Sequence, residues 1–153
     1  MALRTILTDE SPKLRKISRE QVNFDERLHQ LLDDMKETLD HANGAGLAAV
    51  QVGILRRVAI VDVEDVLIEL VNPVVLSIDG EQEVTEGCLS VVGKWGKTIR
   101  PQRVKVKAFD RYGNEFELEG EDLLALALVH EIDHLDGKLY TDIVVGELWE
   151  DNE

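Results

Sequence analysis

No apolar stretch in this 153-residue sequence approaches the length that a membrane-spanning helix needs. The first residues, Met-Ala-Leu-Arg-Thr-Ile, also lack the cationic and then apolar layout of a secretion signal, and the residues after them are too acidic for a transit peptide. We therefore expect a cytoplasmic protein that makes no contact with a membrane.

Basic residues are scarce relative to acidic ones. The chain has 17 Lys and Arg against 31 Asp and Glu, which gives a formal net charge of −14. These basic residues form no stripe along the sequence that could attract a phosphate backbone against this overall charge. We expect no direct binding to nucleic acid.

Cysteine is almost absent, since Cys88 is the single one. An internal disulfide is therefore excluded, and the fold needs no oxidising compartment. Aromatic residues make up only 5% of the chain, but the apolar content of 44% is ordinary for a globular protein and excludes a disordered one. No repeat, linker or low-complexity tract interrupts the sequence before its acidic tail, so we expect a single domain spanning residues 1–153.

The first predicted helix starts near residue 23. Asn23 is placed as its N-cap, with Glu26 at the third helical position, and apolar residues then recur at helical spacing from Leu28 to Leu39. Asn43-Gly44 is typical of a helix end.

Strand-like segments follow this helix. Residues 57–63 and 66–76 are rich in β-branched side chains, and Asn72-Pro73 is expected to bend the second segment. Residues 103–110 alternate between apolar and basic side chains, and residues 112–114 are typical of a hairpin turn.

A second helix is predicted over residues 122–136 and ends at Gly137. Residues 123–129 contain no polar side chain, which is typical of a helix buried on all sides. Several strands and a late buried helix predict an α+β fold in which the strands surround that helix.

The most informative motif lies in this second helix, as His130-Glu131-Ile132-Asp133-His134. Positions i and i+4 share one helix face, so both imidazoles can reach the same metal ion. Glu131 lies one step around the helix, where it can hold a water molecule at that ion. The motif is typical of metal-assisted hydrolysis.

A catalytic metal site usually has a third protein ligand. The extended motif H-E-x-x-H-x-x-G-x-x-H would place a histidine at position 140, which is Tyr140. A glutamate on a later helix is also disfavoured, because only nineteen residues (153 − 134) follow His134, and Glu147 and Glu150 lie in that short tail. Cys88 is the remaining candidate, although a lone cysteine is more often a small buried apolar residue.

Residues 44–51 match the dinucleotide-binding pattern G-x-G-x-x-A only weakly. That pattern must follow a strand and begin a helix, whereas this segment follows a predicted helix. Taken alone, the segment predicts a flexible turn with a solvated Gln51.

Three motifs together resemble the signature motifs of the peptide deformylases. They are Gly-Ala-Gly-Leu-Ala-Ala-Val-Gln at 44–51, Glu-Gly-Cys-Leu-Ser at 86–90 and His-Glu-Ile-Asp-His-Leu-Asp-Gly at 130–137, in this order. The resemblance implies an α+β fold with antiparallel sheets around a central C-terminal helix that carries the histidines. It also implies an enzyme that hydrolyses the formyl group from nascent polypeptides beginning with N-formylmethionine.

The resemblance assigns the metal ligands to Cys88, His130 and His134, and general base and acid catalysis to Glu131. It implies one divalent ion, which we expect to be Fe(II), with zinc, nickel and cobalt as alternatives. It also implies that the enzyme works close to ribosomes, but the acidic tail disfavours a stable dock on ribosomal RNA, so we expect a monomer that meets ribosomes transiently.

The same resemblance assigns the donors to the formyl oxygen. They are the side chain of Gln51 and the backbone N–H of Leu89. Gly44, Gly46 and Leu47 are expected to contact the substrate, which would pair with this segment like an added strand.

Some residues depart from the pattern of the family or leave two interpretations open. Val129 and Val92 stand where glutamine and proline are usual. Trp95 is either a contact for substrate at the rim of the cleft or an exposed aromatic without function. Glu86 and Arg100 either pair to hold the cysteine segment or are two solvated charges. An H-E-x-x-H metallopeptidase and a non-catalytic formyl-peptide-binding relative are the alternative functions.

Overall fold

Two helices and eight strands make up most of residues 2–150, which are the residues that the computed structural model describes. Neither helix in this range combines the length and apolar character that crossing a membrane requires. The elements are, in chain order, α1 (Glu26–Ala42), β1 (Gly46–Ala48), β2 (Val58–Val63), β3 (Val66–Asp79), β4 (Gln82–Cys88), β5 (Val91–Arg100), β6 (Arg103–Phe109), β7 (Glu115–Glu121), α2 (Asp122–Leu135) and β8 (Val145–Glu150).

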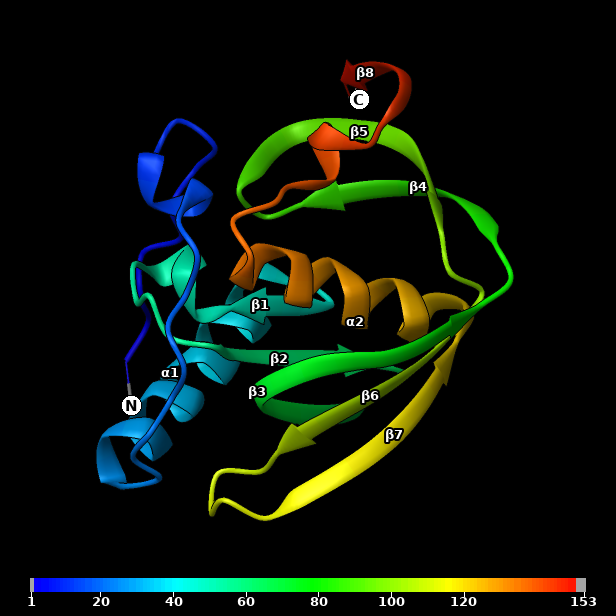
Figure 1. Ribbon diagram of the computed structural model, residues 1–153. Helices are drawn as coiled ribbons and strands as arrows, with labels where there is room; N and C mark the ends of the chain where they lie inside the picture. The colour runs from blue at the N-terminus through cyan, green and yellow to red at the C-terminus, as the bar shows by residue number, and fades with distance from the viewer. Residues whose placement is uncertain (1, 151–153) are drawn as a thin grey trace.

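The strands form two antiparallel sheets with α2 between them (Figure 1). One sheet has five strands in the order β1-β2-β3-β6-β7, and the other has three in the order β4-β5-β8. Helix α1 packs beside β1 and β2. The predicted α+β class, with antiparallel sheets and a helix near the C-terminus, is confirmed.

Helix α2 is buried because its sequence offers apolar side chains to every neighbour. Ala125, Leu128 and Ile132 pack with inward residues of the five-stranded sheet, such as Val104 and Val106. The opposite face of α2 carries the polar side chains of the motif, which are also buried: His130, Glu131 and His134. The helix therefore anchors these three side chains in the core.

The end of α2 is fixed by two contacts. Gly137 has φ +75°, and a Cβ there would lie 2.6 Å from the carbonyl oxygen of Arg15, so only glycine fits. Arg57 Nη1 donates to the carbonyl of Leu135 at 3.1 Å and to Asp136 at 3.0 Å, which satisfies acceptors at the helix end. The predicted range of residues 122–136 differs from the observed one by a single residue.

Helix α1 starts later than the sequence predicts. Its N-cap is Asp25, whose carboxylate accepts the backbone N–H of Leu28 at 3.2 Å, so the prediction of Asn23 as N-cap is wrong. The backbone carbonyl of Asn23 instead accepts from the side chain of Gln21. The helix ends as predicted, at Asn43 in the left-handed region with φ 56°.

The carboxylate of Asp34 on α1 holds the N-terminal segment. It accepts the backbone N–H of Ala2 at 2.9 Å, Nε of Arg4 at 3.0 Å and Nε2 of Gln30 at 2.7 Å. Burial favours the protonated form of Asp34, but these hydrogen bonds outweigh it and lower the pKa of the carboxyl below its ordinary value.

The strands agree with the sequence in the five-stranded sheet and less well elsewhere. Asn72 has φ 51°, and the pairing of β3 with β6 shifts between Val71 and Val74, so the predicted bend exists inside one longer strand. The turn between β6 and β7 is closed by Asp110, whose carboxylate accepts from two backbone N–H groups. Residues 145–150, which include the start of the acidic tail, form β8, which the sequence did not predict.

Candidate metal centre

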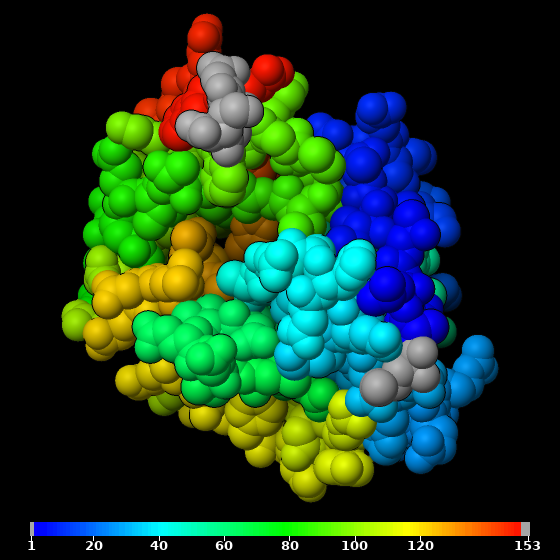
Figure 2. Space-filling model, turned by 180° about the vertical axis from the view of Figure 1, so that it is seen from behind, coloured from blue at the N-terminus to red at the C-terminus, as the bar shows by residue number. Residues whose placement is uncertain are grey.

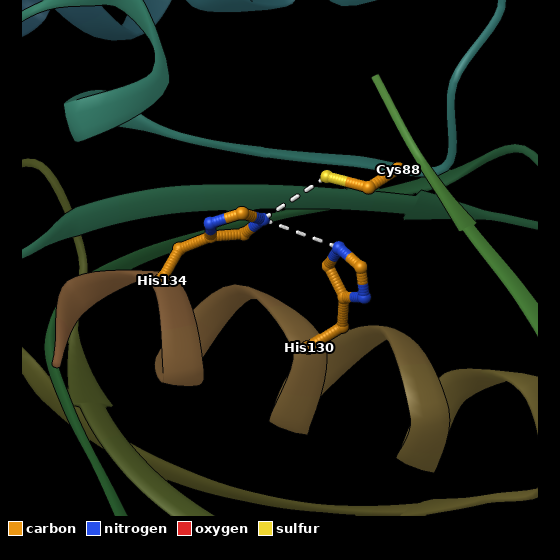
Figure 3. Close-up of side chains that lie close together, drawn as sticks. All are labelled: Cys88, His130 and His134. Carbon is orange, nitrogen blue, oxygen red and sulfur yellow. Dashed lines mark hydrogen bonds between the residues drawn. The ribbon is translucent and has the colours of Figure 1, made fainter. Parts of the chain in front are cut away.

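His130 and His134 lie one turn apart on α2 and point toward the same place (Figure 3). Their Nε2 atoms are 3.2 Å apart, and both side chains are buried. Two ligands held about 2.1 Å from one ion in tetrahedral geometry lie roughly 3.4 Å apart, so this separation suits a shared ion.

Cys88, at the end of β4, approaches the same two imidazoles (Figure 3). Its Sγ is 3.3 Å from Nε2 of His134, and the three ligand atoms all lie within 4.8 Å of one another. Cys88 is the last residue of β4, and residues 89 and 90 turn the chain into β5, where Val91 pairs with Cys88. This pairing holds the end of β4, and with it the thiol, above α2. Lone pairs that converge in this way repel one another unless a cation or a proton lies between them, and one thiolate with two imidazoles suits a first-row divalent ion.

Glu86 orients His130 from the side away from this centre. Its carboxylate accepts a hydrogen bond from Nδ1 of His130 at 2.6 Å. It also accepts hydrogen bonds from Nε and Nη2 of Arg100, at 2.9 and 2.6 Å, and from the hydroxyl of Thr98. Burial would raise the pKa of Glu86, but the hydrogen bonds from His130 and Arg100 lower it to about 2. An ionised carboxylate can only accept, so Nδ1 of His130 carries the proton and Nε2 keeps a lone pair for an ion.

Arg100 joins the two elements that bear the ligands. Besides Glu86 on β4, it donates from Nη1 to Asp133 on α2 at 2.8 Å. The arginine is 5% exposed and Glu86 is 2% exposed, so the interpretation of two solvated charges is wrong. The other interpretation from the sequence, a pair that holds the cysteine segment, is the one observed.

Glu131 is buried beside the histidines with a free oxygen. Its Oε1 has no hydrogen-bond partner among residues 2–150, although the side chain is only 3% exposed. Burial raises the pKa of this carboxyl to about 7. A buried oxygen without a partner in a polar cavity is a binding position for a water molecule or a substrate N–H.

The backbone of Gly46 confines the Glu131 side chain. A Cβ at position 46 would lie 2.5 Å from Oε2 of Glu131 and 2.9 Å from its Cδ and Cγ. Glycine is therefore required here for the carboxylate to take its place. At Gly44 a Cβ would meet the flexible ends of Leu39 and Leu89, each at 2.9 Å.

Gln51 is buried, with 1% of its surface exposed, so the prediction of a solvated side chain in a flexible turn is wrong. Residues 46–48 form β1, and residues 49–52 form a 3₁₀ helix. Oε1 of Gln51 accepts the backbone N–H of Ala48 at 2.9 Å, while Nε2 donates to Ser90 at 3.0 Å and lies 3.7 Å from Sγ of Cys88. The amide N–H₂ therefore faces the metal centre.

A cavity of about 470 Å³ opens beside these groups. Figure 2 shows it as a hollow between the greens of β4 and β5, the orange of α2 and the cyan of the segment after α1. Cys88, Gln51 and Glu131 line one part of the cavity, and apolar side chains that include Leu126 and Ala127 line another. Such a combination suits a ligand with one reactive polar end and one apolar group.

The remaining predicted residues take different places. Leu89 lines the cavity directly after Cys88. Leu47 is fully buried between α1 and β2, so its side chain lies in the core and not in the cavity, which leaves only its backbone for a substrate contact.

The three residues at the third-ligand positions of the metallopeptidase arrangements lie outside the group formed by Cys88, His130 and His134. Tyr140 is buried, and its hydroxyl donates to the carbonyl of Lys94 at 3.2 Å. Glu147 and Glu150 lie in β8, with exposed side chains.

Comparison with known proteins agrees with this geometry. The family model for polypeptide deformylases matches residues 3–147. A peptide deformylase of Caldicellulosiruptor bescii is 57% identical over 145 residues, which cover 95% of this chain and 87% of that protein. The crystal structure of a peptide deformylase from Thermotoga maritima has a TM-score of 0.92 at 36% identity, covering 94% of this chain and 99% of that one. The crystal structure of a peptide deformylase from Legionella pneumophila has a TM-score of 0.91 at 44% identity and covers 94% and 86%.

Proposed function

The chain belongs to the polypeptide deformylase family and removes the N-formyl group from nascent polypeptides, and we propose that Cys88, His130 and His134 hold the metal ion for this hydrolysis. The observation that carries the proposal is the convergence of three buried ligand atoms within 4.8 Å of one another beside an unpartnered carboxylate oxygen. Fe(II) is the proposed ion, with zinc, nickel and cobalt as alternatives, because thiolate and imidazole ligands suit all four. A divalent ion bound there would polarise the formyl carbonyl and lower the pKa of a water molecule beside it.

Glu131 is the proposed general base and acid. Its free Oε1 takes a proton from the attacking water as the oxygen of that water bonds to the formyl carbon. The proton then passes to the nitrogen of methionine as the carbon–nitrogen bond breaks, so that formate and a free amine leave. Burial of the carboxylate away from bulk water favours both transfers, because no competing donor lies within reach of Oε1 among the described residues.

Gln51 and the backbone N–H of Leu89 are the proposed donors to the formyl oxygen as negative charge develops on it. The hydrogen bond from Ala48 to Oε1 of Gln51 supports this role, because it fixes which end of the amide faces Cys88. A donor that is already oriented needs no rearrangement during the reaction, and this is the source of its catalytic effect.

The apolar part of the cavity is the proposed site for the methionine side chain. Leu126 and Ala127 lie on the same side of α2 as the histidines, about one turn before His130, so the apolar wall continues directly from the metal centre. The backbone of residues 44–46 borders the cavity and is the proposed pairing edge for an extended substrate.

The enzyme acts on nascent polypeptides, so we place it in the cytoplasm as a monomer with one catalytic domain that meets ribosomes transiently. The net charge of −14 supports a transient contact, because it opposes a lasting contact with ribosomal RNA. The metallopeptidase alternative is not favoured, since the positions of its third ligands lie outside the metal centre.

The proposed site and ion are tested by formate release. Protein prepared without oxygen should release formate from a formyl-methionyl peptide and should leave acetyl-methionyl and unblocked peptides intact. The metal content of the same sample identifies the ion, and replacement of Cys88 by serine should lower it well below one ion per chain. A Cys88→Ser protein that keeps full metal content and activity would remove the thiol from the ligand set. Faster loss of activity in air than without oxygen would support iron, because the thiolate is then exposed to metal-linked oxidation.

A further inference from the structure

The two tryptophans of the chain lie opposite each other on neighbouring strands of the three-stranded sheet. Trp95 on β5 pairs in register with Trp149 on β8, so both side chains lie on the same face of the three-stranded sheet. Trp95 is 39% exposed and Trp149 is 41% exposed. Only Trp95 lines the cavity, which makes the neighbouring indole a matched control.

The indole of Trp95 covers the backbone beside the metal centre. A Cβ at Gly87 would lie 2.5 Å from Cζ3 of Trp95 and 2.6 Å from Cε3, so the edge of the six-membered ring rests on the residue before Cys88. The ring is thereby held in place on one side, while more than a third of the side chain remains open to solvent. A fixed and partly exposed aromatic ring is suited to bind another apolar side chain.

The position of a bound substrate indicates which of its residues reaches this ring. The formyl carbon must lie near Cys88, and the methionine side chain enters the apolar part of the cavity. In an extended peptide, side chains alternate between two faces, so the third residue points to the same side as methionine, about 6.6 Å farther along. Trp95 lines this same cavity at its rim, next to the backbone of Gly87.

We propose that Trp95 binds the side chain of the third residue of the formyl peptide and gives this enzyme a preference for aromatic and large apolar residues there. The inference rests on the proposed substrate site and deepens it. Because the third residue undergoes no chemical change, the contact stabilises the bound substrate and the transition state equally, and the preference lies in KM and not in kcat.

The test compares formyl-Met-Ala-Phe with formyl-Met-Ala-Ser on the metal-loaded enzyme. We expect the ratio of their kcat/KM values to be about three to ten, the usual strength of an aromatic contact. Trp95→Leu, which still covers Gly87 but has no aromatic face, should bring the ratio close to one, and Trp95→Phe should restore most of it. Trp149→Leu should leave the ratio at its wild-type value.

Three outcomes would overturn the inference. They are an unchanged ratio in Trp95→Leu, an equal loss in Trp149→Leu, and a preference that follows the second residue when formyl-Met-Phe-Ser and formyl-Met-Ala-Ser are compared. Hydrolysis of formyl-Met-Ala, which has no third residue, is measured in parallel. If the wild-type enzyme does not deformylate this dipeptide or the tripeptides, the proposed function fails, whereas dipeptide activity without a Trp95-dependent ratio refutes only the role of Trp95.

Discussion

Replacement of Gly46 by alanine should displace the carboxylate of Glu131, the proposed general base, without touching a proposed metal ligand. The added Cβ would lie 2.5 Å from Oε2 of Glu131, and such contacts do not fall below 3.0 Å, so the carboxylate must retreat by at least about 0.5 Å. Catalytic groups have to be held within roughly 0.5 Å of their productive position, and a displacement near 1 Å costs about 100-fold. We expect kcat to fall about 10- to 100-fold.

The assay is steady-state formate release from formyl-Met-Ala-Ser, with metal content and thermal stability measured on the same samples. Metal content should change little, because the atoms nearest to the added Cβ all belong to Glu131 and not to Cys88, His130 or His134. Ala45→Ser serves as the control, since it adds an atom to the exposed neighbouring residue. Its effect on kcat should be far smaller than that of Gly46→Ala.

A double substitution tests the cause of the effect. Glu131→Asp shortens the side chain by one methylene and withdraws the carboxylate from position 46. Gly46→Ala should therefore cost much less in the Glu131→Asp enzyme than in the wild type, which is the non-additivity expected of two residues in contact. If the two effects add fully, or if Gly46→Ala alone lowers kcat less than about threefold, Gly46 does not position Glu131.

Three further predictions follow from other contacts. Gln51→Ala should lower kcat by about 10²–10³-fold, or roughly 3–4 kcal/mol, with metal content unchanged, and an unaltered kcat would exclude the amide as a donor to the formyl oxygen. Glu86→Gln should destabilise the protein by up to about 3–5 kcal/mol in urea unfolding, because it removes the buried carboxylate paired with Arg100 and leaves the partly exposed Asp133 as its remaining ionic partner. It should also weaken metal binding about 10- to 100-fold through His130; unfolding at the wild-type urea concentration would contradict the prediction. The lowered pKa of Asp34 contributes stability that is fully present above the ordinary pKa of aspartate and is lost as the pH falls through its folded-state value. Asp34→Asn should therefore make the free energy of unfolding less dependent on pH below about pH 4. If the free energy of unfolding falls with acid in the same way in both proteins, Asp34 is not the group responsible.

The parts of the fold that the sequence predicts well are those set by local patterns. Helix α2 was placed to within one residue because an unbroken apolar run and a glycine that must adopt positive φ mark its body and its end. The shared face of His130 and His134 follows from the helical repeat alone. The start of α1 was misplaced because Asn23 and Asp25 are both good N-cap residues, and only the contacts of residue 23 outside the helix decide between them.

The parts that were missed depend on contacts between distant segments. Taken alone, the segment around Gln51 predicts a solvated side chain, yet its amide is enclosed by Ala48, Cys88 and Ser90, the last two more than thirty residues away (88 − 51 = 37). No local pattern shows that a polar side chain will be satisfied by a strand that folds over it later. The resemblance to a family supplied its role, while the sequence around it indicated a turn. Strand β8 was missed for a related reason, since its pairing with β5 is what orders it.

The arrangement of the centre explains how two separate elements place three ligands. The two imidazoles come from a rigid helix, but Cys88 comes from the end of a strand in the three-stranded sheet, so the site is only as well defined as the contact between that sheet and α2. Arg100 supplies that contact, because it holds Glu86 of β4 and Asp133 of α2 at the same time in a buried position. Glu86 in turn fixes the ring of His130 from behind. Hydrogen bonds within the chain therefore fix the position of the thiol relative to the imidazoles, and an ion that binds there meets ligands already oriented toward it.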